Sequence, residues 1–188
     1  MSKFKVTFTL DETDANYFRS LYRKAKLGAK DLDKDSIIAE ARSTVQQVRG
    51  NAKTPQFVLD AIDVLADLVD LIQDEAYAAP KKVHDEVLAA LAYFSNPEDL
   101  IPDHVPGLGF LDDAIMVKFI EEEFKHELWG FRRFRKLRDS AEQRPWASPG
   151  SERLQQRLAD DRKRVRGQIE EREAKEALKK KAGKSFGW

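Results

Sequence analysis

Residues 96–113, which read N-P-E-D-L-I-P-D-H-V-P-G-L-G-F-L-D-D, constrain this chain more than any other stretch. They include three prolines, two glycines, four aspartates and a glutamate, and they lie between two apolar segments with helical periodicity. Because proline fixes φ and glycine allows φ values that other residues avoid, this composition predicts a rigid, specifically shaped loop. We interpret the loop as a structural keystone or a docking surface.

The same stretch resembles the signature of the DUF1232, or YkvA-like, family, which runs approximately S-P-x-D-L-I-P-D-x-x-P-x-x-G-x-x-D-D. The residues in register with it are Pro97, Asp99, Leu100, Ile101, Pro102, Asp103, Pro106, Gly109, Asp112 and Asp113. The similarity extends weakly over residues 83–124, and Asn96 stands where the family usually has serine. The family has no established biochemical activity, so the resemblance implies a structural unit and no particular reaction.

The composition predicts a soluble cytoplasmic protein with one domain and an extension. Of the 188 residues, 41% are hydrophobic and 35% are charged, against about 25% charged in typical soluble domains. Cysteine is absent, which removes disulfide and thiolate chemistry. The N-terminus has no apolar run typical of a secretion signal. The longest apolar run, residues 87–94, is far shorter than the roughly 20 residues that span a bilayer, so no transmembrane segment is predicted.

The formal net charge of zero conceals an asymmetry along the chain. Residues 130–188 contain 18 Lys or Arg and 9 Asp or Glu, which gives +9 and leaves −9 for residues 1–129. This distribution predicts an acidic body with a basic arm.

The predicted fold is mainly α: a helical bundle with one short N-terminal β-strand and an extended, charged C-terminal helix. Residues 3–10 alternate apolar and polar side chains, which is typical of a half-buried strand. A single strand leaves backbone groups unpaired, so we expect it to pair with a partner, for example with a second copy in a homodimer.

Capping signals and periodicity predict five helices in the bundle. The first is capped by Asp11 and ends at Gly28, and the third opens with Thr54 as N-cap and Pro55 as first helical residue. The others cover residues 34–49, 81–94 and 111–128. The predicted domains are a bundle over residues 1–143, a linker over 144–151 and a basic helix or tail over 152–188.

The aspartates of the loop have two interpretations. Brought together, Asp99, Asp103, Asp112 and Asp113 would bind a hard divalent cation, Mg²⁺ or Ca²⁺. Alternatively, aspartates at a helix start and beside a proline turn bind backbone N–H groups, and we favour this interpretation. His84, His104 and His126 lie near the loop, but their spacing does not match a metal-binding motif.

The second strong signal is basic and aromatic, in residues 129–138 (W-G-F-R-R-F-R-K-L-R). If helical, the segment places Arg132, Arg133, Arg135, Lys136 and Arg138 around an apolar stripe, a pattern that binds phosphates or an anionic membrane surface. Alternatively, its apolar residues close the bundle while the arginines are solvated or pair with the acidic body. The end of the chain is also basic, through Lys179, Lys180 and Lys181.

The leading functional hypothesis is a non-enzymatic interaction or regulatory protein with a protein partner. It would dock through residues 96–113 and engage an anionic partner (nucleic acid, ribosome or membrane surface) through its basic arm. The second hypothesis is a metal-dependent, hydrolase-like enzyme that uses the four aspartates. The third is peripheral membrane association through residues 129–138.

Overall fold

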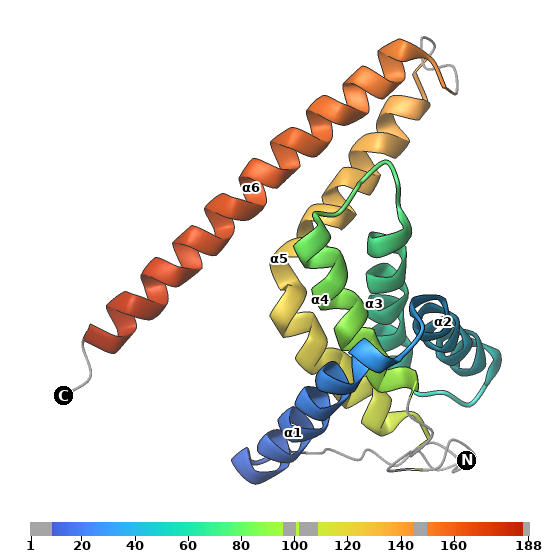
Figure 1. Cartoon of the computed structure of the whole chain (residues 1–188), viewed down its shortest axis with the longest axis vertical. Coiled ribbons are helices and arrows are strands. Elements are labelled where there is room, and N and C mark those ends of the chain that lie inside the picture. The colour runs from blue at the N-terminus through green and yellow to red at the C-terminus, as the bar shows by residue number, and fades with distance from the viewer. Residues whose placement is uncertain (1–8, 96–100, 102–108, 145–149, 186–188) are drawn as a thin grey trace. The chain divides into compact units, whose positions relative to one another are not determined.

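The computed structural model describes residues 9–95, 101, 109–144 and 150–185, without the side chains of 182–185. These residues are mainly helical, and no strand occurs among them. The elements are α1 (Glu12–Gly28), η1 (Ala29–Asp31), α2 (Lys34–Gly50), α3 (Gln56–Gln73), α4 (Lys81–Leu91), η2 (Ala92–Ser95), α5 (Leu111–Glu142) and α6 (Glu152–Ser185). Figure 1 labels the α-helices.

The mainly helical prediction is confirmed, but the predicted N-terminal strand is not seen. Residues 9 and 10, which would end it, have no regular structure, and residues 3–8 lie outside the described residues. Dimerisation through this segment therefore stays a prediction.

Two compact units share the chain. Unit 1 comprises Met1–Ile62 and Leu88–Phe119, and unit 2 comprises Asp63–Val87 and Ile120–Trp188. Unit 2 thus contains α6 together with the second part of α5, and Leu154, Val165 and Ile169 of α6 are buried. The predicted division into a bundle over residues 1–143, a linker and a C-terminal helix or tail stays a prediction.

Unit 1 begins with a helix whose start is fixed by local chemistry. The Asp11 carboxylate accepts hydrogen bonds from the backbone N–H groups of Thr13 (2.7 Å) and Asp14 (2.9 Å), and the Asp14 carboxylate accepts from the Asp11 N–H (3.1 Å). This reciprocal capping box confirms the predicted cap. Phe18, one turn further on, stacks on Phe119, with 6.1 Å between the ring centroids.

The start of α3 differs from the prediction by one residue. The carbonyl of Pro55 accepts the N–H of Leu59, so the helix begins at Gln56. The hydroxyl of Thr54 caps no helix start and instead donates to the carbonyl of Val48, 3.0 Å away near the end of α2. Thr54 therefore joins the end of one helix to the approach to the next.

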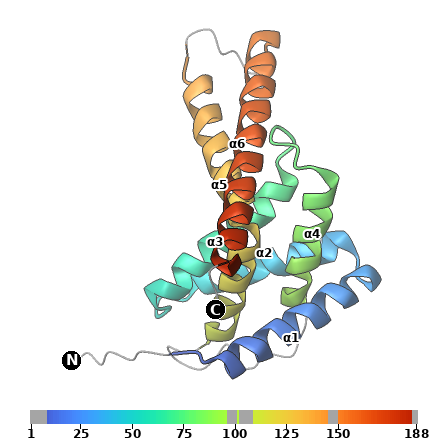
Figure 2. The same cartoon turned by 90° about the vertical axis from the view of Figure 1, so that its left-hand side faces the viewer.

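In unit 2, the second part of α5 and α6 form an antiparallel hairpin, which can be followed in Figures 1 and 2. The sequence predicted that the fifth helix ends near residue 128, but α5 continues to Glu142 and kinks at Phe124 (φ −102°, ψ 15°). At Gly130, side chains of α6 pack directly against the backbone of α5. A Cβ atom built there would lie 2.3 Å from Ile169 Cδ1 and 3.3 Å from Val165 Cγ1. Only glycine permits this approach of α6.

We expect Gly130→Ala to lower the free energy of unfolding by about 1–3 kcal/mol, because the added methyl group overpacks the contact with Ile169. Gly167→Ala is the matched control in α6, since its Cβ would meet nothing within 4 Å. Gly167→Ala should raise the free energy of unfolding by about 0.4–1 kcal/mol, because alanine reduces the conformational freedom of the unfolded chain. Urea denaturation followed by circular dichroism measures both, and equal effects of the two substitutions would contradict the close contact.

Candidate functional site

The hairpin is built around a polar triad of the buried Tyr77 and Glu127 and the partly buried Arg166. Tyr77, in the loop between α3 and α4, donates its hydroxyl to Glu127 Oε2 at 2.9 Å. Arg166 of α6 forms an ion pair with Glu127 Oε1 and donates to the Tyr77 oxygen at 3.2 Å. Tyr77 is 1% exposed and Glu127 6% exposed. Three distant segments of the chain thus meet at one carboxylate.

The surroundings of Tyr77 keep its hydroxyl protonated, so that it remains a hydrogen-bond donor. Burial, and then the negative charge of Glu127, raise the pKa of the phenol well above its ordinary value, although Arg166 opposes part of this shift. The ring packs against Phe131 and Phe134, with centroids 5.3 and 5.5 Å away. The phenol therefore stays protonated and bonded to the carboxylate at neutral pH.

The loop that carries Tyr77 is fixed at both sides. The Tyr77 N–H donates to Asp74 Oδ1 at 2.9 Å, and the other oxygen of Asp74 accepts from Arg138 at 2.6 Å. Arg162 of α6 donates to the carbonyl of Ala76 at 3.1 Å. Both α5 and α6 therefore hold this loop through charge-assisted hydrogen bonds.

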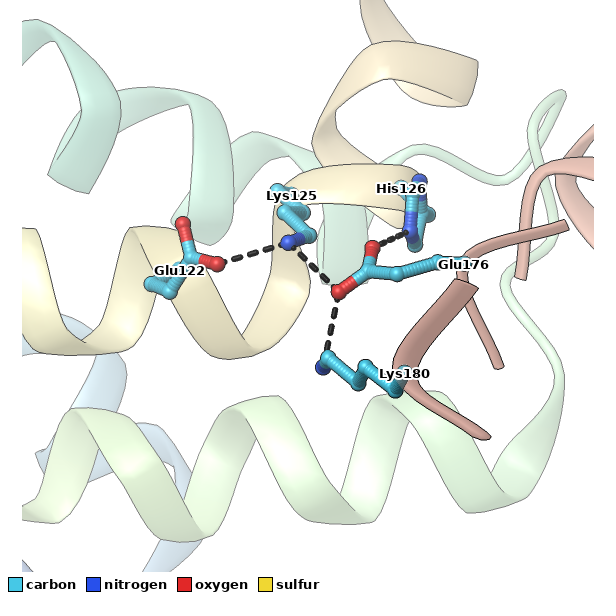
Figure 3. Close-up of polar contacts among 5 residues, drawn as sticks. All are labelled: Glu122, Lys125, His126, Glu176 and Lys180. Atoms are coloured by element: carbon cyan, nitrogen blue, oxygen red, sulfur yellow. Dashed lines mark hydrogen bonds and ion pairs between the residues drawn. The ribbon is translucent and has the colours of Figure 1, made fainter. Parts of the chain in front are cut away.

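A second carboxylate, Glu176, joins the distal part of α6 to α5, as Figure 3 shows. Glu176 accepts from Lys125 at 2.9 Å and from Lys180 at 2.7 Å, and its other oxygen lies 2.6 Å from His126 Nε2. Lys125 also donates to Glu122 at 2.6 Å. Hydrogen bonds from Lys125, Lys180 and His126 lower the pKa of Glu176 to about 2, so this carboxylate is ionised at neutral pH.

A cleft of about 300 Å³ lies between the start of α4, α5 and α6 within unit 2. Acidic side chains dominate its lining, which comprises Pro80, Lys82, Val83, Glu86, Glu123, Phe124, His126, Glu127, Arg166, Ile169, Glu170 and Glu173. His126 directs one ring nitrogen at Glu176, whereas Nδ1 is buried with no hydrogen-bond partner within the described part of the chain. The described residues contain no group of three His, Asp or Glu placed to hold a metal ion.

The predicted basic run of residues 129–138 divides into two sets. Arg132 and Arg135 donate to the two oxygens of Asp67, at 2.6 and 2.8 Å, and Arg138 binds Asp74. This follows the alternative in which arginines pair with the acidic body. Arg133 and Lys136 are exposed. At the other basic segment, Lys179, Lys180 and Lys181 are exposed, and Lys180 pairs with Glu176.

Most of the predicted docking loop lies outside the described residues. This holds for Asn96, Pro97, Asp99, Leu100, Pro102, Asp103 and Pro106, and for His104. Of the rest, Gly109 is buried, and Asp112, 4% exposed, accepts the N–H of Ile101 at 3.2 Å. Such a bond is typical of the backbone-binding interpretation, while the metal site formed with Asp99, Asp103 and Asp113 stays a prediction.

The residues that organise unit 2 were missed by reasoning from the sequence. Tyr77 and Glu127 are separated by 50 residues and Glu127 and Arg166 by 39, and neither pair forms a local motif. His126 likewise pairs with Glu176, 50 residues further along the chain, while Glu122 in the turn before His126 pairs with Lys125. One signal was present: Glu127 interrupts the otherwise apolar face of α5 between Phe124, Leu128 and Phe131.

Comparison with known families agrees with the resemblance in the sequence. Residues 86–119 match the family model "Protein of unknown function (DUF1232)". The resemblance to DUF1232 is therefore confirmed, for a segment that covers α4 from Glu86, η2, the predicted docking loop and the start of α5. No curated protein and no solved structure matches the chain. The matched family has no assigned activity, and Tyr77, Glu127 and Arg166 all lie outside the matched segment.

No helix among the described residues is both long and apolar enough to cross a membrane. Peripheral association through residues 129–138 stays a prediction.

Glu127→Ala should lower the free energy of unfolding by about 3–5 kcal/mol, because it leaves the Arg166 guanidinium without its carboxylate in a largely buried site. Adding Arg166→Met should recover part of the loss, since the uncompensated charge is then removed. The control is Glu171→Ala, whose partner Lys175 lies 3.9 Å away at the surface, and which should change stability by less than about 0.5 kcal/mol. Chemical denaturation measures all three, and a Glu127 effect as small as the control would rule out the triad as a stabilising centre.

The pKa of Glu176 predicts a pH dependence for the hairpin. Since its pKa falls from 4.5 to about 2 on folding, its contribution is complete above pH 4.5 and is lost as the pH falls towards 2. Wild type should therefore be more stable than Glu176→Gln at pH 6, and the difference should narrow steadily between pH 5 and 2. Denaturation curves of both proteins across this range test it, and a difference that does not change with pH would contradict the assignment.

Proposed function

We propose that the chain is a non-enzymatic binding protein whose α5–α6 hairpin engages an anionic partner. The observation that carries this proposal is the division of charge on the hairpin. Two of its carboxylates, Glu127 and Glu176, bind basic side chains within unit 2, while the basic side chains of Arg133, Lys136, Lys179 and Lys181 are exposed. The hairpin thus presents these positive charges to solvent, alongside exposed acidic residues such as Glu171 and Glu173.

The titration of Glu176 on the hairpin, and of Tyr77 in the loop that contacts it, supports binding over catalysis at these two groups. General acid–base catalysis works best with a pKa near the operating pH. The pKa of Glu176 is about 2 and that of Tyr77 lies far above its ordinary value, so both groups keep one protonation state around neutral pH. Such groups suit permanent structural bonds better than proton transfer.

Binding to immobilised heparin, a soluble polyanion, tests the proposal. The purified full chain should be retained at low salt and elute as salt rises, because polyanion binding releases counterions. The triple variant Lys136→Gln, Lys179→Gln, Lys181→Gln should elute at lower salt. A matched control with the same change in net charge is Lys24→Gln, Lys30→Gln, Lys53→Gln, at exposed lysines of unit 1.

Failure of wild type to bind heparin at low salt would refute the proposed function. Equal shifts for the two triple variants would show that attraction is spread over the whole chain and not located on the hairpin.

A further inference from the structure

Two arginines of the hairpin differ from seven others on α5 and α6. An intramolecular carboxylate or carbonyl binds Arg132, Arg135, Arg138, Arg157, Arg162, Arg164 and Arg166. Arg133 on α5 and Arg172 on α6 are exposed, and neither has a carboxylate partner among the residues described. Since α5 and α6 carry many carboxylates, two arginines without one are notable positions.

These two arginines meet at the same aromatic side chain. The guanidinium carbon of Arg172 lies 4.4 Å from the centroid of the Trp129 ring, and that of Arg133 lies 5.6 Å from it. Trp129 is half-buried on α5 and belongs to the same unit as both arginines. Cation–π attraction to the indole restrains the guanidinium groups without neutralising them. Their N–H donors therefore remain available to an outside acceptor.

We propose that Trp129, Arg133 and Arg172 form a phosphate-binding site for single-stranded nucleic acid. Arginine recognises phosphate with two parallel N–H donors, and a guanidinium plane also stacks on an exposed base. Lys136 lies three residues after Arg133, and Lys179 lies seven residues after Arg172. Residues at these spacings share a helix face, so these two exposed lysines add positive charge on the same faces as the two arginines.

The chemistry of the surface favours nucleic acid over a membrane. Peripheral helices bind membranes by burying a large apolar face as well as by charge. Within the described residues of unit 2, Leu178 is the only large hydrophobic side chain that is well exposed. Single strands require a positive surface and planar groups for stacking, which the Trp129 site provides. This inference rests on the proposed function, because it names the partner of the same hairpin.

Fluorescence anisotropy of the full chain with a labelled single-stranded oligonucleotide of about 12 nucleotides tests the site. We expect Arg133→Gln with Arg172→Gln to weaken binding about tenfold or more, because two charge-assisted contacts are lost. The slope of log affinity against log salt should fall by about 1.4 for two lost phosphate contacts. The charge-matched control is Arg23→Gln with Lys163→Gln, at exposed positions outside the site, and should change affinity less than about twofold.

Trp129→Leu separates a defined site from general attraction, because it removes the platform and keeps every charge. It should also weaken binding several-fold, with Arg133→Lys, Arg172→Lys giving an intermediate affinity. Circular dichroism melting curves check that each variant is folded, and Trp129→Phe retains an aromatic ring if Trp129→Leu does not fold.

The outcomes distinguish the proposed anion-binding function from the nucleic-acid site at Trp129. Heparin retention without oligonucleotide binding would refute the nucleic-acid inference and leave the proposed function standing. Oligonucleotide binding weakened equally by the site pair and the control pair would refute the Trp129 site. Binding to vesicles containing anionic phosphatidylserine, with no binding to the oligonucleotide, would assign the surface to lipid and overturn the inference.

Discussion

The structure of unit 2 depends on the requirement that a buried carboxylate be paired. Removing a carboxylate from water costs several kcal/mol, and Glu127 is almost entirely buried. Its two oxygens have two partners, Tyr77 from the α3–α4 loop and Arg166 from α6. A shift of α6 or of the α3–α4 loop would remove a partner from the Glu127 carboxylate. The triad therefore sets the register of α6 against α5 as well as holding the loop.

This constraint explains how a helix as polar as α6 stays attached. Few of its apolar side chains are buried, so hydrophobic burial alone gives it little hold on α5. Close packing at Gly130 lets Val165 and Ile169 contact the α5 backbone, and ion pairs extend the attachment on both sides of that point, at Arg166 and at Glu176. Packing thus supplies contact at one position, while charges fix direction and register.

Local chemistry could be predicted from the sequence, and distant pairing could not. The Asp11 cap and the bounds of most helices follow from neighbouring residues, and they were predicted closely. Arg132 and Arg133 are adjacent and chemically identical, yet one binds Asp67, 65 residues away, and the other rests on Trp129. The sequence around Arg132 and Arg133 gives no sign of this difference. Only the three-dimensional position of Asp67 distinguishes them, so the sequence alone does not tell which arginines pair within the chain.

That distinction changes how the charge asymmetry of the chain bears on its function. A count of +9 for residues 130–188 suggests a strongly basic arm, but an arginine bound to a buried carboxylate attracts a distant anion much less than an unpaired one. The arginines paired with Asp67, Asp74, Asp161 and Glu127 therefore contribute less to such attraction. The remaining exposed cations form a smaller set, and their arrangement matters more for binding than the net charge of +9. Two guanidinium groups held against one indole have a restricted orientation before any ligand arrives, which supports the binding site proposed for Trp129, Arg133 and Arg172.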